Sequence, residues 1–271
     1  MFQERLISSV VIVALIFGSM YIGGWVWTGL VMLLILGAQK EYADMMKVKG
    51  YKVPLPLLQI LAVLMVGIQS YNIGIISELA IVLSFVAMVT WLISTQDDFA
   101  NYAYGLVGYM MLAWSLSFLV CLENIYEGWW ITLLAFLVVW TTDAGAYCIG
   151  MLIGKHKMAP VISPKKSWEG AIGGTLCCLL AVNVYNDLFL QYPWWFMTVL
   201  ALVCSVLGQI GDLLESWLKR WVGVKDSGDL IPGHGGLMDR FDSMVLVAPL
   251  LYYLLVLYHS VEIYFDYWNI F

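Results

Sequence analysis

The chain has 271 residues, of which 62% are apolar and 12% are charged, and its formal net charge is -6. About a quarter of the residues in a typical soluble domain are charged, so this composition excludes water as the solvent for most of the surface. Apolar runs of about 18 to 20 residues recur along the sequence, and a run of that length crosses the core of a bilayer as an α-helix. We therefore expect an all-α polytopic membrane protein.

About nine transmembrane helices are predicted along the chain. In order, the expected spans are 6–22, 24–40, 54–71, 76–95, 102–121, 128–153, 168–187, 193–218 and 240–258. Only Gly23-Gly24 separates the first two spans. We favour a helical hairpin there over one bent helix, because a single helix of that length would overshoot the bilayer.

The first span is expected to remain as a membrane anchor. It could also be read as a secretory signal peptide, but no clear small-residue cleavage site ends it. No appended soluble domain is predicted, so residues 1–271 are expected to form a single transmembrane domain. Within it we expect residues 1–125 to act mainly as a scaffold and residues 126–260 to carry the chemistry.

The basic residues predict the orientation in the membrane. With nine helices, all 13 Lys and Arg residues fall on one side, which the positive-inside rule makes cytoplasmic. The opposite loops carry acids such as Glu123, Glu127 and Asp187. Despite the negative net charge, the cytoplasmic loops are locally basic and suit anionic lipid headgroups or nucleotide phosphates.

The span 193–218 carries a polar stripe at its end. Asp212, Glu215, Ser216 and Lys219 are spaced i, i+3, i+4 and i+7, so they share one face of a helix. An ionised carboxylate near the membrane centre costs roughly 2.5 to 3.5 kcal/mol, so such residues turn inward and mark a site. An interhelical salt bridge through Lys219 is the alternative, although one lysine does not require two acids and a hydroxyl.

The last span is expected to open with a matching stripe. Asp239, Asp242 and Ser243 are spaced i, i+3 and i+4, and this helix enters from the same edge as the preceding one ends. The two acidic stripes are therefore expected to meet. Carboxylates from two facing helices suit a hard cation such as Mg²⁺, whereas zinc would call for Cys or paired His ligands.

The segment between the stripes, WVGVKDSGDLIPGHGG, is too polar and glycine-rich to cross lipid. Gly235 and Gly236 allow close backbone approach and positive φ, which suggests a phosphate cradle. A flexible cytoplasmic loop is the alternative. His234 is a further candidate, as a phosphate donor, an acid or a structural hydrogen-bonding group. The cationic groups that bracket this loop are Lys219, Arg220, Lys225 and Arg240.

A second group of polar residues lies earlier in the chain. Asp143 sits inside an apolar run, where an acid again indicates an internal site. Ser163 and Pro164 suggest the N-cap and first position of a helix, which would place Lys165 and Lys166 in its first turn, where anions bind. The alternative is that the two lysines simply flank a membrane span on its cytoplasmic side.

Residues 216–242, SWLKRWVGVKDSGDLIPGHGGLMDRFD, closely resemble the signature of the phosphatidate cytidylyltransferase family, also called CDP-diglyceride synthetases. Residues 143–147, DAGAY, and residues 163–174, SPKKSWEGAIGG, resemble upstream motifs of that family. Two positions depart from its pattern. Ala144 stands where Ser or Thr is common, and Ser167 stands where Thr is more usual.

The resemblance implies transfer of CMP from CTP to phosphatidate, giving CDP-diacylglycerol and pyrophosphate. It implies Asp212 and Asp239 as catalytic ligands of Mg²⁺, with K⁺ as a candidate second cation, and Lys219 and Lys225 as catalytic groups that neutralise phosphates. The substrate-binding residues would be Asp143, Lys165, Lys166, Ser216, Arg220, His234, Gly235, Gly236, Arg240 and Asp242.

The expected partners are CTP, phosphatidate and membrane lipid, with no nucleic acid, and the resemblance implies a homodimer. We expect a multi-pass protein of a bacterial inner membrane whose site faces the cytoplasm. An anion transporter, a structural scaffold and a CDP-alcohol phosphotransferase are weaker interpretations, since paired broken helices and a D-G-x-x-A-R motif are both missing from the sequence. Asp97 and Asp98 receive no functional interpretation.

Overall fold

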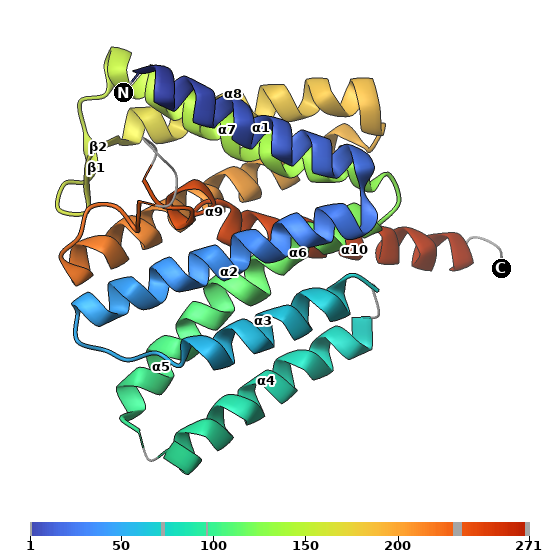
Figure 1. Cartoon of the computed structure of the whole chain (residues 1–271). Helices are drawn as coiled ribbons and strands as arrows, with labels where there is room; N and C mark the ends of the chain where they lie inside the picture. The colour runs from blue at the N-terminus through green and yellow to red at the C-terminus, as the bar shows by residue number, and fades with distance from the viewer. Residues whose placement is uncertain (1, 72–73, 96, 230–234, 269–271) are drawn as a thin grey trace.

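The computed structural model describes the chain except for residues 1, 72–73, 96, 230–234 and 269–271 (Figure 1). The chain is almost wholly helical. The long helices are α1 Phe2–Ile22, α2 Gly24–Val48, α3 Leu55–Gln69, α4 Gly74–Thr95, α5 Phe99–Gly108, α6 Ser115–Asn124, α7 Gly128–Ile153, α8 Trp168–Tyr185, α9 Trp194–Val222 and α10 Met244–Trp268. The π-helical segments η1 Tyr109–Trp114 and η2 Asn186–Leu190 continue α5 into α6 and extend α8.

The predicted class of an apolar helical membrane protein is supported. Within the described part of the chain, five segments are long and apolar enough to cross a bilayer: Phe99–Asn124, Gly128–Ile153, Trp168–Leu190, Trp194–Val222 and Met244–Val261. Shorter apolar helices cover Val10–Ile22, Leu55–Gln69 and Leu79–Thr95. The count of nine spans remains a prediction.

The break between the first two helices lies where the glycine pair predicts it. Gly23 and Gly24 have φ of 67° and 52°, in the left-handed region that glycine enters without steric cost. The chain therefore forms α1 and α2 as separate helices rather than one bent helix. Helix α2 runs on to Val48, beyond the predicted end at residue 40.

The Asp97 and Asp98 pair has a structural role. The Asp98 carboxylate caps α5 by accepting a hydrogen bond from the backbone N–H of Ala100 at 3.0 Å. Asp97 accepts a hydrogen bond from the side-chain amide of Asn101 at 3.0 Å. The two acids thus fix the start of the long run α5–η1–α6, which begins before the predicted residue 102.

A short hairpin replaces the predicted helix start at Ser163. Strand β1 Lys157–Ala159 pairs antiparallel with β2 Ser163–Ser167, so Lys165 and Lys166 lie on a strand and the prediction of a first helical turn is wrong. The cap is Ser167, whose hydroxyl accepts from the N–H of Gly170 at 3.2 Å. Pro164 is tolerated because both strands of a two-stranded sheet are edge strands.

The predicted acidic stripe at the start of the last helix is also wrong. Residues Met238–Arg240 form the 3₁₀ turn η3, and α10 begins only at Met244. Side chains compete for the backbone donors here, since Glu41 accepts from the N–H groups of Leu237 and Met238. Asp239, Asp242 and Ser243 therefore precede the helix instead of sharing one of its faces.

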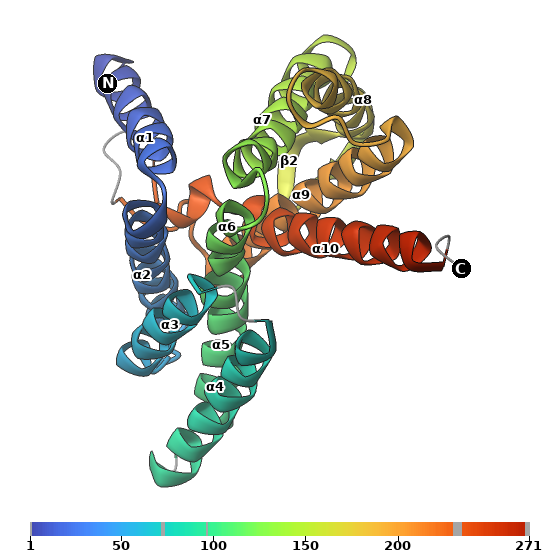
Figure 2. The same cartoon turned by 90° about the vertical axis from the view of Figure 1, so that its right-hand side faces the viewer.

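The connections that carry basic residues gather at one end of the molecule. In Figure 1 the β1–β2 hairpin, the α2–α3 connection and the α9–α10 connection lie on the left, while the α6–α7 and α8–α9 connections lie on the right. Figure 2 shows α7, α8 and α9 grouped together and α2 to α5 grouped apart, with α6 between them. The arrangement agrees with the predicted segregation of these loops.

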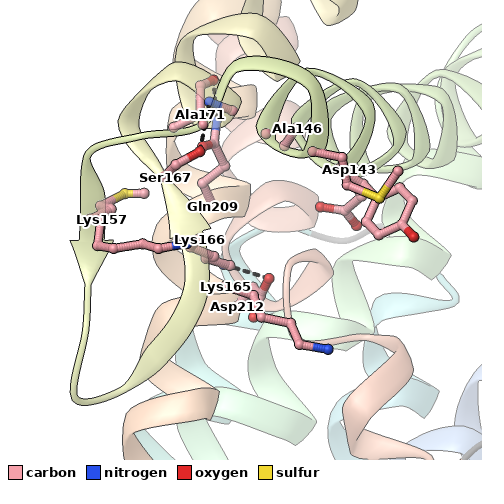
Figure 3. Close-up of a pocket in the computed structure, with 15 residues that line it drawn as sticks. Asp143, Ala146, Lys157, Lys165, Lys166, Ser167, Ala171, Gln209 and Asp212 are labelled. Atoms are coloured by element: carbon pink, nitrogen blue, oxygen red, sulfur yellow. Dashed lines mark hydrogen bonds and ion pairs between the residues drawn. The ribbon is translucent and has the colours of Figure 1, made fainter.

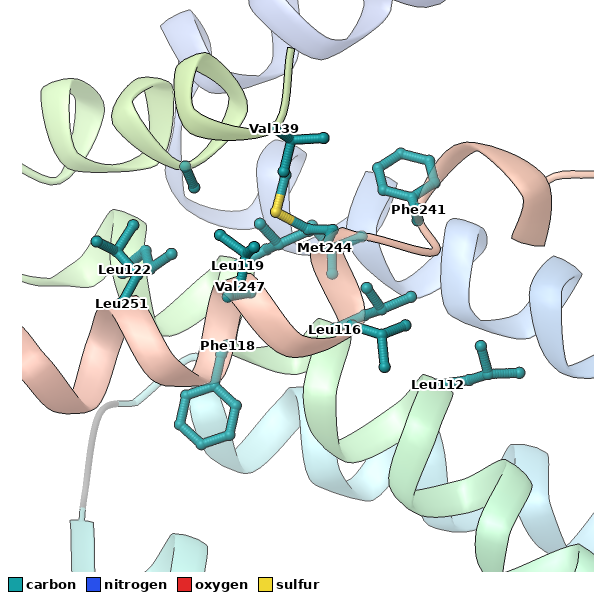
Figure 4. Close-up of a cluster of buried hydrophobic side chains, with 14 of the residues drawn as sticks. Leu112, Leu116, Phe118, Leu119, Leu122, Val139, Phe241, Met244, Val247 and Leu251 are labelled. Carbon is teal, nitrogen blue, oxygen red and sulfur yellow. The ribbon is translucent and has the colours of Figure 1, made fainter. Parts of the chain in front are cut away.

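The core lies where α6, α7 and α10 meet (Figure 4). Leu119 and Leu122 of α6 pack with Val247 and Leu251 of α10, and all four are at most 1% exposed. Polar groups in this interior are paired, as when the Trp27 indole N–H donates to the carbonyl of Leu119 at 2.9 Å. Helix α6 thus joins the two helix groups.

Small residues allow α7 and α8 to approach closely. A Cβ added at Gly174 would lie 2.9 Å from the Cβ of Ala146, and one added at Gly145 would lie 2.8 Å from the Cβ of Cys177. Close backbone approach through small residues is a common way for membrane helices to pack. This contact sets the position of α7 relative to α8 and therefore shapes the space between them.

We predict that Gly174→Val lowers the Tm of the detergent-solubilised protein, because the added atoms would push α7 and α8 apart. Overpacking of a dense interior typically costs about 1 to 3 kcal/mol. Gly67→Ala is the control, since a Cβ there meets nothing within 4 Å. An unchanged Tm for Gly174→Val would contradict the packing described here.

Candidate functional site

A pocket of about 670 Å³ opens between α7, α8, α9 and the β-hairpin (Figure 3). Four predicted site residues line it: Asp143 from α7, Lys165 and Lys166 from β2, and Asp212 from α9. The other lining residues are Ala146, Tyr147, Gly150, Met151, Gly154, Lys157, Met158, Ser167, Gly170, Ala171 and Gln209. The pocket thus brings together residues that are far apart in the sequence, and the lysines reach it from a strand.

Charges of both signs face each other across this pocket. Lys166 Nζ lies 2.5 Å from Asp212 Oδ2, and each side chain remains about a quarter exposed, at 25% and 27%. Asp143 interacts electrostatically with both Asp212 and Lys166. Three lysines among the lining residues can meet an anion while the two acids attract a cation. The pocket therefore suits a phosphorylated ligand that carries a metal ion.

A second polar cluster lies one to two turns further along α9. Lys219 Nζ is 3.2 Å from Glu215 Oε2 and 2.5 Å from Asp239 Oδ1. The other oxygen of Asp239 accepts from the N–H groups of Ser227 at 3.1 Å and Gly236 at 2.9 Å. Burial alone would raise the pKa of Asp239, but the Lys219 ammonium and the two N–H donors hold that pKa below its usual value.

Asp242 connects the cluster with the pocket. Burial, together with the neighbouring Asp212 carboxylate, raises the pKa of Asp242. Asp242 also interacts electrostatically with Glu215 and Lys219. On α9 itself, the Ser216 hydroxyl donates to Asp212 Oδ1 at 3.3 Å. The two groups of charges therefore form one continuous polar region.

The residues of the predicted stripe on α9 contact two different groups of residues. Lys219 does form the salt bridge that was the alternative interpretation, because it bridges Glu215 and Asp239. Asp212 takes no part in that bridge and instead lines the pocket beside Lys166. Both interpretations thus describe part of the stripe.

Glu41 of α2 is a site-supporting residue that the sequence interpretation missed. Its carboxylate is 5% exposed and accepts from the Ser227 hydroxyl at 3.0 Å and from the N–H groups of Leu237 at 2.8 Å and Met238 at 2.9 Å. It therefore holds both ends of the segment that presents Asp239. Because the predicted helix ends at residue 40, Glu41 was treated as a loop residue. In the structure α2 continues to Val48, and an acid buried in a helix would have indicated a site.

The glycines near Asp239 allow close packing, as predicted. Gly235 has φ of 80°, and a Cβ on Gly236 would lie 2.6 Å from Glu41 Oε2. The N–H of Gly236 donates to Asp239, so in this structure the loop binds its own carboxylate. His234 lies outside the described residues.

Three predicted cations lie away from the pocket lining. Arg220 donates to the carbonyls of Ile162 at 3.4 Å and Val224 at 3.1 Å, and so ties the end of α9 to the hairpin. Lys225 and Arg240 are exposed, the former after α9 and the latter in η3. Their roles toward phosphates remain predictions.

Of the two predicted Mg²⁺ ligands, Asp212 lines the pocket, whereas Asp239 lies in the Lys219 cluster. A metal role for them remains a prediction. Among the described residues, no group of three or more His, Cys, Asp or Glu side chains is arranged to hold a metal by itself. Magnesium is usually bound through one or two carboxylates together with water and substrate phosphates, so a complete protein cage is not required. Glu215 Oε1 and Ser243 Oγ are buried without a hydrogen-bond partner in the described part of the chain, which leaves oxygen atoms available beside Asp242.

The structure therefore combines apolar helices that can cross a membrane with a charged pocket at one end of those helices. A profile of the Cytidylyltransferase family matches residues 3–258, and the chain belongs to this family. It is 37% identical over 266 residues to a phosphatidate cytidylyltransferase of Staphylococcus epidermidis, covering 94% of this chain and 99% of the relative.

Two further relatives carry the same name. The one from Staphylococcus saprophyticus is 38% identical over 231 residues, which cover 83% of this chain and 87% of the relative. The one from Staphylococcus aureus is 38% identical over 242 residues, which cover 86% and 91%. The predicted family is thereby confirmed.

We predict that Glu41→Ala frees the segment after α9, because three buried or partly buried donors lose their acceptor. Each hydrogen bond to a charged group contributes about 1.5 to 3 kcal/mol, so the loss of even one corresponds to at least roughly tenfold more frequent opening. Tryptic cleavage after the exposed Lys225 should accelerate accordingly in detergent-solubilised protein.

Asp44→Ala is the matched control for this experiment, since Asp44 lies on the same helix and bonds only the exposed Lys47 among the contacts recorded for its side chain. Cleavage at equal rates in the two variants would show that Glu41 does not hold the segment.

Proposed function

We propose that the protein transfers CMP from CTP to phosphatidate and releases CDP-diacylglycerol and pyrophosphate. One structural observation carries the proposal: Lys165, Lys166, Asp143 and Asp212 line a single pocket at the end of apolar helices. Membership of the Cytidylyltransferase family and the names of the three relatives support the same activity.

In the proposed reaction a phosphate oxygen of phosphatidate attacks the α-phosphorus of CTP. A new phosphorus–oxygen bond forms, the bond from that phosphorus to the bridging oxygen of the β-phosphate breaks, and pyrophosphate leaves. The nucleophile is already anionic at neutral pH, so a strong general base is unnecessary. The main barrier is repulsion between anions, which fixed cations reduce.

The residues of the pocket suit this task. Lys166 and Lys165 would neutralise phosphates in the pocket, and Asp143 would shape its inner wall. Lys219 would remain charged as the counterion of Glu215 and Asp239 and so hold the Asp239 carboxylate in place. Ser216 would orient Asp212 through the hydrogen bond between their side chains. Lys225, Arg220 and Arg240, which lie away from the pocket lining, would contribute positive charge on the same side of the protein.

A divalent cation is part of the proposal. Asp212 and Asp239 are the proposed ligands of Mg²⁺, and Asp242 lies in electrostatic contact with Asp212. Bound Mg²⁺ would neutralise charge on the phosphates during transfer. K⁺ is proposed as a second cation, with the unpartnered Glu215 Oε1 and Ser243 Oγ as candidate oxygen donors.

The proposed setting is a bacterial inner membrane crossed several times, with the pocket facing the cytoplasm. The lysine-rich connections on the pocket side support that orientation under the positive-inside rule. A homodimer is proposed from the family resemblance. CTP and phosphatidate are the expected substrates.

The activity is tested with purified protein in mixed micelles, by following label from α-³²P-CTP into lipid. Label should enter lipid only when phosphatidate and Mg²⁺ are both present. Folded protein that forms no labelled lipid, with Mg²⁺ and K⁺ supplied, would contradict the proposal and favour an anion transporter.

We predict that Asp212→Asn lowers kcat/KM by about 100-fold or more, because one fixed charge of the reaction site is lost. The Tm should change little, since Asp212 is partly exposed and Asn preserves its shape. Asp229→Asn, in the exposed part of the loop after α9, is the matched control and should retain activity. Activity near that of the wild type in Asp212→Asn would remove Asp212 from the site.

Asp239→Asn should behave differently, with activity and stability falling together. Its carboxylate is 10% exposed and binds Lys219, Ser227 and Gly236, so the change removes the closer of the two counterions of the buried Lys219 ammonium and leaves Glu215 at 3.2 Å. Breaking such a pair typically costs about 3 to 5 kcal/mol. Thermal unfolding and kcat/KM measured on the same preparation test this, and an unchanged Tm would show that the pair does not stabilise the fold.

A further inference from the structure

An apolar groove of about 580 Å³ runs between α8 and α9, outside the polar pocket. Its volume lies within the roughly 300 to 1,000 Å³ of ligand-binding cavities. Helix α8 contributes Trp168, Ala171, Ile172, Thr175, Leu176 and Leu179, and α9 contributes Leu202, Val206, Gln209, Ile210 and Leu213. The lining is almost wholly aliphatic or aromatic, and both helices belong to segments that can cross a bilayer. The groove is therefore an apolar space at membrane depth.

The groove is continuous with the charged pocket. Met158, Ala171 and Gln209 line both spaces. The Gln209 amide donates to Thr175 Oγ1 at 3.0 Å and to the carbonyl of Ala171 at 3.3 Å, so its polar end is held by α8. Gln209 thus marks the boundary at which a charged space becomes an apolar one.

The groove is open toward the surrounding lipid. Ile172, Leu176 and Ile210 are 60%, 55% and 45% exposed, although each is a large apolar side chain. From Ala171 to Leu179 the groove follows α8 for roughly 12 Å, at the rise of an α-helix. A ligand could therefore enter sideways from the bilayer while its polar end reaches Lys165 and Lys166.

We propose that this groove holds one acyl chain of the lipid substrate while the phosphate of the same molecule occupies the pocket. The inference rests on the proposed function and adds to it where the lipid chain lies. A single amphiphile is the occupant that matches both spaces, because the two share a wall and differ sharply in polarity. A second copy of the chain would cover the apolar face but would not account for its continuity with the lysines.

Filling the groove tests the proposal. Ile172→Trp and Leu176→Trp should raise the KM for dipalmitoyl phosphatidate by about tenfold, since lost burial of two methylene groups corresponds to that factor. The KM for CTP and for dihexanoyl phosphatidate should stay near the wild-type values. Leu180→Trp and Val184→Trp are the controls, because both residues are exposed on α8 and neither lines the groove.

An equal rise in KM for dipalmitoyl and dihexanoyl phosphatidate, or no rise in either KM, would overturn the acyl-chain assignment. If the dependence is unchanged but the variants alter the oligomeric state in sedimentation, the groove is instead a contact between copies. Wild-type protein that labels no lipid would refute the proposed function itself.

Photolabelling of α8 and α9 by phosphatidate with a diazirine at its acyl end then tests the groove without turnover, and labelling elsewhere would contradict it.

Discussion

An ionised carboxylate enclosed by membrane helices is stable only beside a cation or several hydrogen-bond donors. Three acids near the site satisfy this requirement in three ways. Glu41 accepts three hydrogen bonds from the segment after α9, Asp239 accepts two and also pairs with Lys219, and Asp212 pairs with Lys166. These partners come from helices, a strand and a loop that the sequence separates widely. Pairing of the acids therefore determines how the elements around the site are held.

This requirement ties the first half of the chain to the second. Glu41 contacts residues that follow it by 186 to 197 positions, and the segment it holds carries Asp239. The interpretation of residues 1–125 as mainly a scaffold remains a prediction, but α2 supports the site directly. Helix α6, buried along most of its length, joins the same two regions through apolar contacts. Polar and apolar contacts thus reinforce one arrangement.

Periodicity predicted the helices and the stripe on α9, because a turn of 3.6 residues places Asp212, Glu215 and Ser216 together on any straight helix. Asp143 was singled out because it is an acid inside an apolar run, and Lys166 because of an expected helix start that the structure replaces with a strand. The local pattern failed at Ser163, which pairs in a β-hairpin, and at Asp239, where the distant Glu41 accepts hydrogen bonds from the preceding backbone N–H groups. Glu41 was missed for the same reason, since its partners lie in a distant loop. The groove between α8 and α9 depends on packing that no single segment encodes.

The Lys166–Asp212 pair has a consequence for ligand binding. At 2.5 Å the two charges largely cancel each other, so neither is fully available to a ligand while the pair is intact. An anion that draws Lys166 toward itself exposes the charge of Asp212, which then favours a cation. By thermodynamic linkage, a cation bound at Asp212 must raise the affinity of Lys166 for anions by the same factor. Binding of a cation and binding of an anion at this pair are therefore coupled, so the pair would favour a ligand that carries both charges.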